Sequence, residues 1–143
     1  MSLLSLGIDL GTSGVRSAVV DERGAVVSTA RAGYGPQDPD HVDAQLWWEA
    51  AARCITNQME ALRAADIDPE RIARIGVDGT SGSMVLTDAQ VMPVTPALMY
   101  NSAGFTDEAE AIARHAPDPH ITRGAGSALG RLLRLQSFER AGD

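Results

Sequence analysis

The 143-residue sequence predicts an α/β fold, in which a mixed five-stranded β-sheet is flanked by helices. Three observations support this class. Short apolar runs separated by glycine turns begin the chain and predict strands. A long segment with apolar residues three and four positions apart follows them and predicts an amphipathic helix. Another apolar run after this helix predicts a strand parallel to the first.

The first three strands are expected to form an antiparallel meander. Residues 3–9 are a short apolar run that ends before Gly11, which is typical of a buried strand. Residues 15–21 alternate between two faces, and residues 25–30 return after a tight turn at 22–24. The chain is therefore expected to reverse twice before its first helix.

The long helix is expected at residues 44–65, with Asp43 as its N-cap. Its apolar positions fall on one face, which predicts packing against the sheet. Residues 72–78 are typical of a buried strand, and residues 83–87 predict the fifth strand.

Two helices are expected in the C-terminal part of the chain. Thr106 is the expected cap of the first, whose opening turn is acidic and so complements the helix dipole. The prolines at 117–119 end this helix, and residues 127–140 predict the second.

Composition excludes several classes of function. The net charge of −7 disfavours binding to polyanions, so we expect neither nucleic acid nor a membrane surface as partner. All 12 basic residues are arginine, which excludes a P-loop lysine or a lysine Schiff base within these residues. Cys54 is the one cysteine, and we expect a buried, unreactive thiol. No signal peptide or membrane-spanning run is evident, so a cytoplasmic location is expected.

The turn after the first predicted strand combines a carboxylate, glycines and hydroxyls: Asp9, Gly11, Thr12, Ser13 and Gly14. Backbone N–H groups in such a turn can point into one concavity and bind phosphate oxygens, and the hydroxyls add donors. Asp9 can hold a hydrated Mg²⁺ beside the phosphates, and Arg16 can add positive charge. The alternative is a plain hairpin that needs glycine only for its backbone geometry.

A second glycine turn, at residues 79–82, follows the strand expected at 72–78. Asp78, Thr80, Ser81 and Ser83 offer hydrogen bonds with little charge, which suits a polyol such as a sugar. Asp78 is also the one candidate within the chain for a catalytic base. The alternative is an ordinary turn in which Asp78 caps backbone N–H groups.

Five segments, in this order, resemble the FGGY family of carbohydrate kinases. Residues 7–16 (GIDLGTSGVR) are similar to the family's opening phosphate motif, and residues 38–48 to the run into its first long helix. Residues 75–88 stand where the family has its sugar-binding turn. Residues 96–101 and 126–133 are similar to the strand and the helix that follow. The resemblance therefore extends over nearly the whole chain.

The resemblance implies a ribonuclease-H-like fold of the actin, hexokinase and Hsp70 superfamily. Residues 1–143 would then be the N-terminal, sugar- and phosphate-binding domain of a longer two-domain kinase that uses ATP and Mg²⁺. The metal ligand would be Asp9. The cofactor-binding residues would be Gly11, Thr12, Ser13 and Arg16, and the sugar-binding residues would be Thr80, Ser81 and Gly82.

Departures from the family pattern bear on the substrate. Xylulokinase-like members carry Gln-Met-His at the positions of residues 80–82 and glycerol kinases carry Gln-Arg-Glu, whereas this chain has Thr-Ser-Gly. Most members also have an aspartate and then an arginine after Asn101, where this chain has Ser102 and Gly104. A subgroup of D-ribulose kinases is most similar, so the expected substrate is a ketopentose or pentitol, with D-ribulose favoured.

Other hypotheses stay open from the sequence. The family's catalytic aspartate and adenosine-binding motifs would lie beyond residue 143, so this chain alone is expected to be inactive. If the chain is complete, it is instead a non-catalytic sugar- or phosphate-binding module. An ATPase of the actin or Hsp70 type is a third hypothesis. The Trp47–Trp48 pair and the second glycine turn disfavour it. The oligomeric state is left open, with a homodimer as one possibility.

Overall fold

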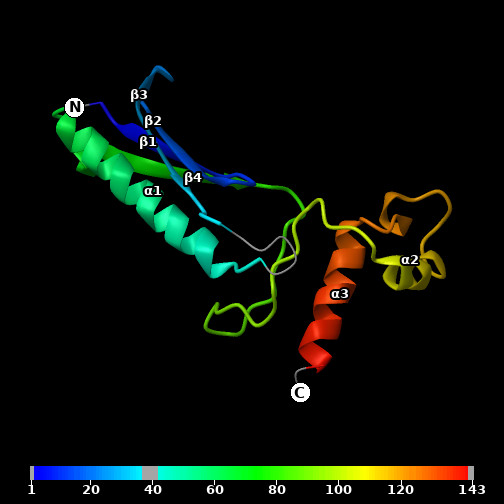
Figure 1. Ribbon diagram of the computed structural model, residues 1–143. Helices are drawn as coiled ribbons and strands as arrows, with labels where there is room; N and C mark the ends of the chain where they lie inside the picture. The colour runs from blue at the N-terminus through cyan, green and yellow to red at the C-terminus, as the bar shows by residue number, and fades with distance from the viewer. Residues whose placement is uncertain (1, 37–41, 142–143) are drawn as a thin grey trace. The chain divides into compact units, whose positions relative to one another are not determined.

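The computed structural model describes residues 2–36 and 42–141, and it divides the chain into two compact units (Figure 1). The first unit holds the segment up to Pro36 together with residues 45–80, and the second holds the remainder. Residues 38–41, which begin one of the segments with family resemblance, lie outside the described residues. Each unit is described by itself below.

The first unit is a four-stranded mixed sheet in the order β3-β2-β1-β4. Its strands are β1 (Leu4–Leu10), β2 (Gly14–Val20), β3 (Val26–Gly33) and β4 (Ile72–Gly79). β1 pairs antiparallel with β2 and parallel with β4, and β2 pairs antiparallel with β3. The predicted meander and the predicted parallel strand are therefore confirmed.

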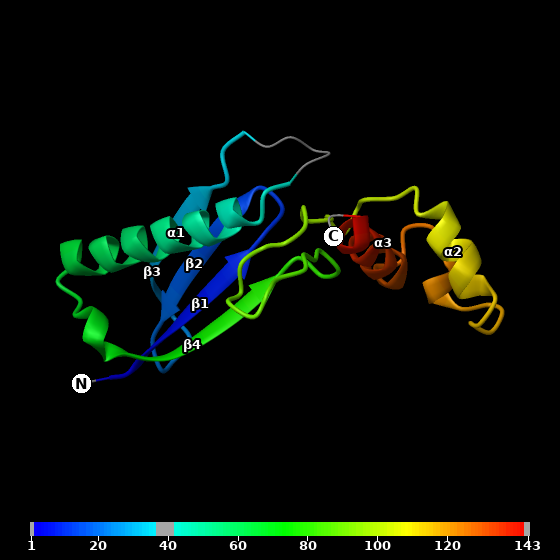
Figure 2. The ribbon, with the colours of Figure 1, turned by 90° about the horizontal axis from the view of Figure 1, so that it is seen from below.

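Helix α1 (Gln45–Ala64) lies along one face of this sheet and packs across β2 and β3 (Figure 2). The alternation predicted for β2 is present, since Val15 and Val19 are fully buried on the side of the helix. The helix contributes its predicted apolar stripe, with Cys54 and Leu62 inaccessible to solvent. Burial of this stripe removes apolar surface from water and is the main favourable contribution to the fold of this unit.

A polar network is buried inside this apolar core. The Gln58 side chain, fully buried in α1, accepts a hydrogen bond from the Ser17 hydroxyl at 2.9 Å and donates one to the Ser28 hydroxyl at 2.6 Å. The Cys54 thiol donates to the same Ser17 oxygen at 3.4 Å. The prediction that Cys54 is a buried thiol is confirmed. The network ties α1 to both β2 and β3; Ser17, Cys54 and Gln58 are buried, and Ser28 is partly exposed.

Strand β4 is not buried, and this corrects the sequence prediction. Ile75 and Val77 are 66% and 67% exposed, although their register partners Leu6 and Ile8 in β1 are buried. β4 is an edge strand of the described sheet, and α1 covers β2 and β3 rather than β4. An apolar run predicts a strand but does not show whether other elements cover its faces, so the pattern alone could not decide whether β4 is buried.

The predicted fifth strand is also wrong within the described residues. The segment at 83–87 forms only isolated bridges, Met84 with Leu98 and Thr87 with Pro93. Pro93 and Pro96 carry no backbone N–H, so they cannot donate to a continuous ladder. The turn predicted after this segment is present, because the Asp88 carboxylate accepts hydrogen bonds from two backbone N–H groups beyond it.

The second unit also contains helices α2 (Thr106–Ala113) and α3 (Ala128–Ala141). The prediction that Thr106 caps this helix is wrong, because Thr106 is the first residue of α2. The N-cap position is Phe105, whose side chain makes no capping hydrogen bond. The Phe105 side chain is buried instead. Two 3₁₀-helices, at 69–71 and 121–123, are the remaining helical elements of the described residues.

An ion pair joins the two helices of the second unit. The Arg134 guanidinium donates two hydrogen bonds to the Glu108 carboxylate and also stacks 5.4 Å from the centre of the Phe105 ring. The paired guanidinium lowers the pKa of Glu108 below its usual value.

Among residues 2–36 and 42–141, no helix has both the length and the apolar character needed to cross a membrane.

Candidate functional site

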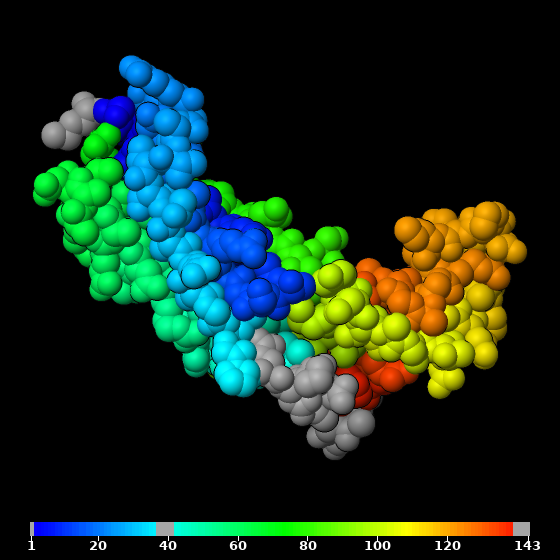
Figure 3. Space-filling model, turned by 45° about the horizontal axis from the view of Figure 1, so that its top comes forward, coloured from blue at the N-terminus to red at the C-terminus, as the bar shows by residue number. Residues whose placement is uncertain are grey.

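Residues 11–14 form the turn between β1 and β2, and because phosphate binding is its predicted role we call it the phosphate turn. The Gly11 N–H donates to the Gly14 carbonyl at 3.0 Å, which closes the turn, and Thr12 and Ser13 are exposed at its tip. In Figure 3 this blue segment lies on the molecular surface. A Cβ on Gly14 would stand 2.5 Å from the Ala32 carbonyl oxygen, so glycine allows β3 to approach the turn closely.

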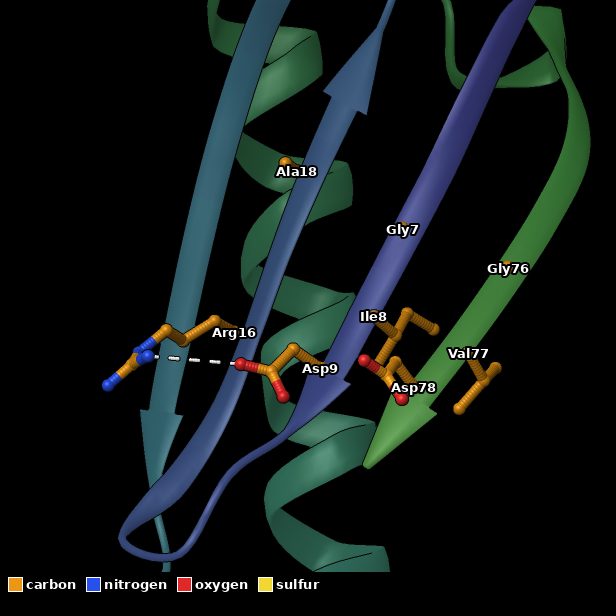
Figure 4. A pocket seen from close by; sticks show the side chains of 8 residues that line it. All are labelled: Gly7, Ile8, Asp9, Arg16, Ala18, Gly76, Val77 and Asp78. Atoms are coloured by element: carbon orange, nitrogen blue, oxygen red, sulfur yellow. Dashed lines mark ion pairs between the residues drawn. The ribbon is translucent and has the colours of Figure 1, made fainter. Parts of the chain in front are cut away.

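Two carboxylates stand side by side where β1 and β4 end. Asp9 and Asp78 are register partners on these parallel strands, and both line a pocket of about 470 Å³ (Figure 4). The floor of the pocket is made of small residues, Gly7, Ala18 and Gly76. One Asp78 carboxylate oxygen accepts from the Gly79 N–H at 2.8 Å. Asp78, predicted at the sugar turn, therefore lies beside the predicted metal ligand.

Positive charge stands next to this pair of carboxylates. The Arg16 guanidinium lies 3.8 Å from the Asp9 carboxylate, and its side chain is 72% exposed (Figure 4). Arg31 is the register partner of Arg16 on β3, and the two line a second pocket of about 400 Å³ together with Ser13. Like charges opposite each other in a sheet are unfavourable without an anion between them. Arg31 was missed from the sequence, because only the β2–β3 register brings it to the turn.

Tyr34 is a further residue that sequence reasoning missed. Its buried hydroxyl donates to the Gly11 carbonyl at 2.8 Å, and its backbone N–H donates to the Ser13 carbonyl at 3.4 Å. Burial raises the pKa of Tyr34 above its usual 10.0, and the charge of Asp9 raises it further. Tyr34 follows β3 directly and donates hydrogen bonds to two carbonyls of the phosphate turn.

We expect Tyr34→Phe to destabilise the protein by about 0.5–1.5 kcal/mol, the usual contribution of one neutral hydrogen bond. The pH dependence of the free energy of unfolding shows whether the Tyr34 hydroxyl causes this loss of stability. Above pH 10 the unfolded chain releases the tyrosine proton and the folded chain keeps it, so the wild-type free energy of unfolding falls as pH rises. Denaturant unfolding between pH 8 and 11 should show this fall in the wild type and a smaller one in the variant. Equal falls in both proteins would contradict this role.

The carboxylate oxygens of Asp9 and Asp78, at the ends of β1 and β4, are of the kind that binds Mg²⁺. This ion prefers hard oxygen donors and is usually held by one or two carboxylates together with phosphate oxygens and water. Asp9 is half exposed and has Asp78 as its neighbour, which is a donor set of this kind. In the part of the chain that the structure describes, no group of three or more His, Cys, Asp or Glu side chains could form a closed metal site.

The predicted sugar-binding residues fall in different units. Thr80 closes the first unit, and both its N–H and its hydroxyl donate to the Leu10 carbonyl, at 3.0 and 3.2 Å. Ser81 and Gly82 begin the second unit, where Ser81 is exposed. The structure thus brings together Asp9, the phosphate turn, Arg16, Asp78 and Thr80, while Ser81 and Gly82 are placed only with respect to the second unit.

Comparison with known proteins gives a consistent result. Residues 4–129 match the N-terminal domain of the FGGY family of carbohydrate kinases. The xylulose kinase of Escherichia coli K12 is 28% identical over 142 residues, which is 94% of this chain and 28% of that protein. The glycerol kinase of Clostridium botulinum is 30% identical over 112 residues, covering 72% of this chain and 22% of that protein. This chain therefore spans less than a third of the length of these curated relatives.

Solved structures agree with these sequence relatives. A crystal structure of a xylulose kinase from Brucella ovis superposes with a TM-score of 0.75 at 27% identity, over 96% of this chain and 29% of that one. A ligand-bound xylulose kinase from Lactobacillus acidophilus superposes with a TM-score of 0.74 at 16% identity, over 96% of this chain and 29% of that one. The predicted α/β class and the predicted actin- and hexokinase-like fold are confirmed by these neighbours.

Proposed function

Because the chain belongs to the FGGY family of carbohydrate kinases, we propose that it forms the N-terminal domain of a protein that transfers a phosphoryl group from ATP to a five-carbon sugar. The observation that carries this proposal is the position of Asp9. Its carboxylate lies at the end of β1, next to the exposed phosphate turn and in one pocket with Arg16 and Asp78. This is the arrangement needed to bind a nucleotide phosphate and its cation at one strand edge.

The residues of the turn would bind and orient the phosphates. Free N–H groups and the hydroxyls of Thr12 and Ser13 can donate to phosphate oxygens, while Arg16 and Arg31 offset negative charge. Mg²⁺, when bound at Asp9, would neutralise phosphate charge. Positioning and electrostatic stabilisation supply most of the catalysis in phosphoryl transfer, and this site offers both. We place the main catalytic base outside these 143 residues, with Asp78 as the alternative within the chain.

We propose a ketopentose or pentitol as substrate, with D-ribulose favoured. The support for D-ribulose is the Thr-Ser-Gly sequence at residues 80–82, which offers a hydroxyl without a bulky or charged side chain. D-Xylulose is the second candidate, because relatives of this chain from E. coli and other bacteria are xylulose kinases. A cytoplasmic location stays a prediction, and the oligomeric state stays open, with a homodimer as one alternative.

A substrate panel tests the proposed function. The complete protein, with ATP and Mg²⁺, would be assayed for ADP release with D-ribulose, D-xylulose, L-ribulose, ribitol and glycerol. We expect kcat/KM to be highest for D-ribulose and lowest for glycerol. A preference for D-xylulose would keep the kinase and correct the sugar, whereas no sugar-dependent turnover with any member would overturn the proposal.

Within this proposal, Ser81→Ala is expected to raise KM for the preferred sugar about 2- to 12-fold, the range for one lost neutral hydrogen bond. KM for ATP should change less than about twofold, because the phosphate turn is a separate segment. Ser137→Ala is the matched control, since this serine is exposed on α3, outside the turn, and its hydroxyl donates to the Arg134 carbonyl at 2.7 Å. An unchanged sugar KM in Ser81→Ala would remove Ser81 from the site.

A further inference from the structure

Arg131 is a buried cation in the second unit, near the start of α3, with only 5% of its surface exposed. Its Nη1 donates to the backbone carbonyls of Tyr100, Ser102 and Gly126, at 2.7, 3.3 and 2.8 Å. Its Nε is buried and has no hydrogen-bond partner. Among the described residues no carboxylate pairs with it, so a positive charge with unused donors is held inside this unit.

The free end of this guanidinium points at the predicted sugar turn. A Cβ built on Gly82 would stand 2.9 Å from Nη2 of Arg131 and 3.9 Å from the Cβ of Tyr100. Gly82 has a φ of +79°, a conformation that favours glycine. The guanidinium therefore occupies the space that a side chain at position 82 would need. None of the described residues accepts a hydrogen bond from Nη2.

The backbone around this guanidinium is held in place. The Ser83 hydroxyl accepts the Tyr100 N–H, and Met84 and Leu98 exchange backbone hydrogen bonds at 3.0 and 2.9 Å. The segments before and after Tyr100 are thus fixed both to the turn and to Arg131. A guanidinium has five N–H donors in a rigid fork, and only Nη1 is used within the described chain.

We propose that Arg131 is a specificity-determining residue that contacts the substrate, with Nη2 donating a hydrogen bond to a hydroxyl or keto oxygen of the sugar at the Gly82 turn. This inference rests on the proposed function. Nη2 has no acceptor among the described residues, and an oxygen-rich ligand at the Gly82 turn would supply one. The absence of a side chain at Gly82 leaves the guanidinium as the polar group at this position of the turn.

Arg131→Lys is the first test, in the complete protein with the sugar that performs best in the panel. Lysine keeps the charge, but its single nitrogen cannot serve the three carbonyls and also reach the sugar. We expect KM for the sugar to rise about 10-fold or more, as for a lost hydrogen bond to a charged group, while KM for ATP changes less than about twofold. The melting temperature is measured alongside, so that loss of folded protein is recognised.

A glycine pair separates contact with the sugar from a purely structural role. Gly82→Ala would push the guanidinium end aside, whereas Gly104→Ala has the same kind of positive φ, +89°, with no atom within 4 Å of the new Cβ. Both variants carry the backbone strain of alanine at positive φ, so both melting temperatures should fall, and that of Gly82→Ala should fall further because its Cβ also displaces the guanidinium. Only Gly82→Ala should raise the sugar KM, by at least fivefold over Gly104→Ala.

The readouts distinguish failure of this inference from failure of the proposed function. If the wild type phosphorylates a sugar and neither Arg131→Lys nor Gly82→Ala changes its KM beyond that of Gly104→Ala, the role of Arg131 is wrong and the kinase stands. If the wild type shows no turnover, binding of D-ribulose and D-xylulose without ATP is measured by calorimetry. Binding that Arg131→Lys weakens 10-fold supports the contact, and binding that it leaves unchanged, or no binding of either sugar, overturns it.

Discussion

Replacing Asp9 with alanine in the complete protein is expected to lower kcat by roughly 100-fold or more and to leave the fold intact. The carboxylate stands where the phosphate charge and its cation would be bound, and preorganised electrostatic groups of this kind contribute most to phosphoryl transfer. Stability should change little, because the only ion pair that Asp9 makes within the described chain is its exposed one with Arg16, at 3.8 Å. Steady-state kinetics with varied Mg²⁺ and thermal unfolding measure the two effects separately.

Variants of two other carboxylates serve as comparisons for Asp9→Ala. Glu22→Gln changes an exposed carboxylate of the same unit that accepts the Leu3 N–H, and kcat should stay within about twofold of the wild type. Asp78→Asn changes the register partner of Asp9. A loss in Asp78→Asn as large as that in Asp9→Ala would indicate a second essential carboxylate at this edge. Near-normal turnover in Asp9→Ala with Mg²⁺ as the only metal would show that Asp9 is not the Mg²⁺ ligand.

Gln58→Ala is expected to lower the free energy of unfolding by about 2–4 kcal/mol, the largest stability effect that we predict for the first unit. The substitution leaves a cavity in the core and removes the acceptor of the buried Ser17 hydroxyl. Asn57→Ala is the matched control. Its amide lies next in the helix but is exposed and donates only to the Arg31 carbonyl, at 3.2 Å, so its loss should cost less than about 1 kcal/mol.

A double variant tests the mechanism behind this loss. Removing both partners of a buried hydrogen bond avoids the unpaired group, so Ser17→Ala in the Gln58→Ala background should add less destabilisation than Ser17→Ala alone. The interaction energy comes from the free energies of unfolding of the four proteins in denaturant. Strict additivity would mean that the two side chains do not act as a unit.

Local patterns in the sequence were sufficient for the elements of the first unit. The alternation around Val15 and Val19 indicated the inner face of β2, and the spacing through Cys54 and Leu62 indicated the face of α1. The glycines at 11 and 14 marked the turn between β1 and β2. In each case the determining residues lie within a few positions of one another, where backbone geometry and amphipathic periodicity act directly.

The identity of the family was also within reach of the sequence. The order of motifs from residues 7–16 to 126–133 predicted a carbohydrate kinase domain, and the match over residues 4–129 confirms the family. The roles of Asp9, Ser81 and the other site residues stay predictions. The choice between D-ribulose and D-xylulose depends on a few side chains at one turn, and the overall resemblance does not reach that detail.

The sequence by itself determined the α/β class, the meander, the long helix, the glycine turns and the family, because each depends on neighbours along the chain. Only the tertiary structure decided that β4 is an exposed edge and that Pro93 and Pro96 leave bridges in place of a strand. It also decided that Tyr34 holds the phosphate turn and that Arg131 fills the space beside Gly82. These contacts join residues 23 and about 50 positions apart, and sheet register and helix packing, rather than local propensity, bring such partners together.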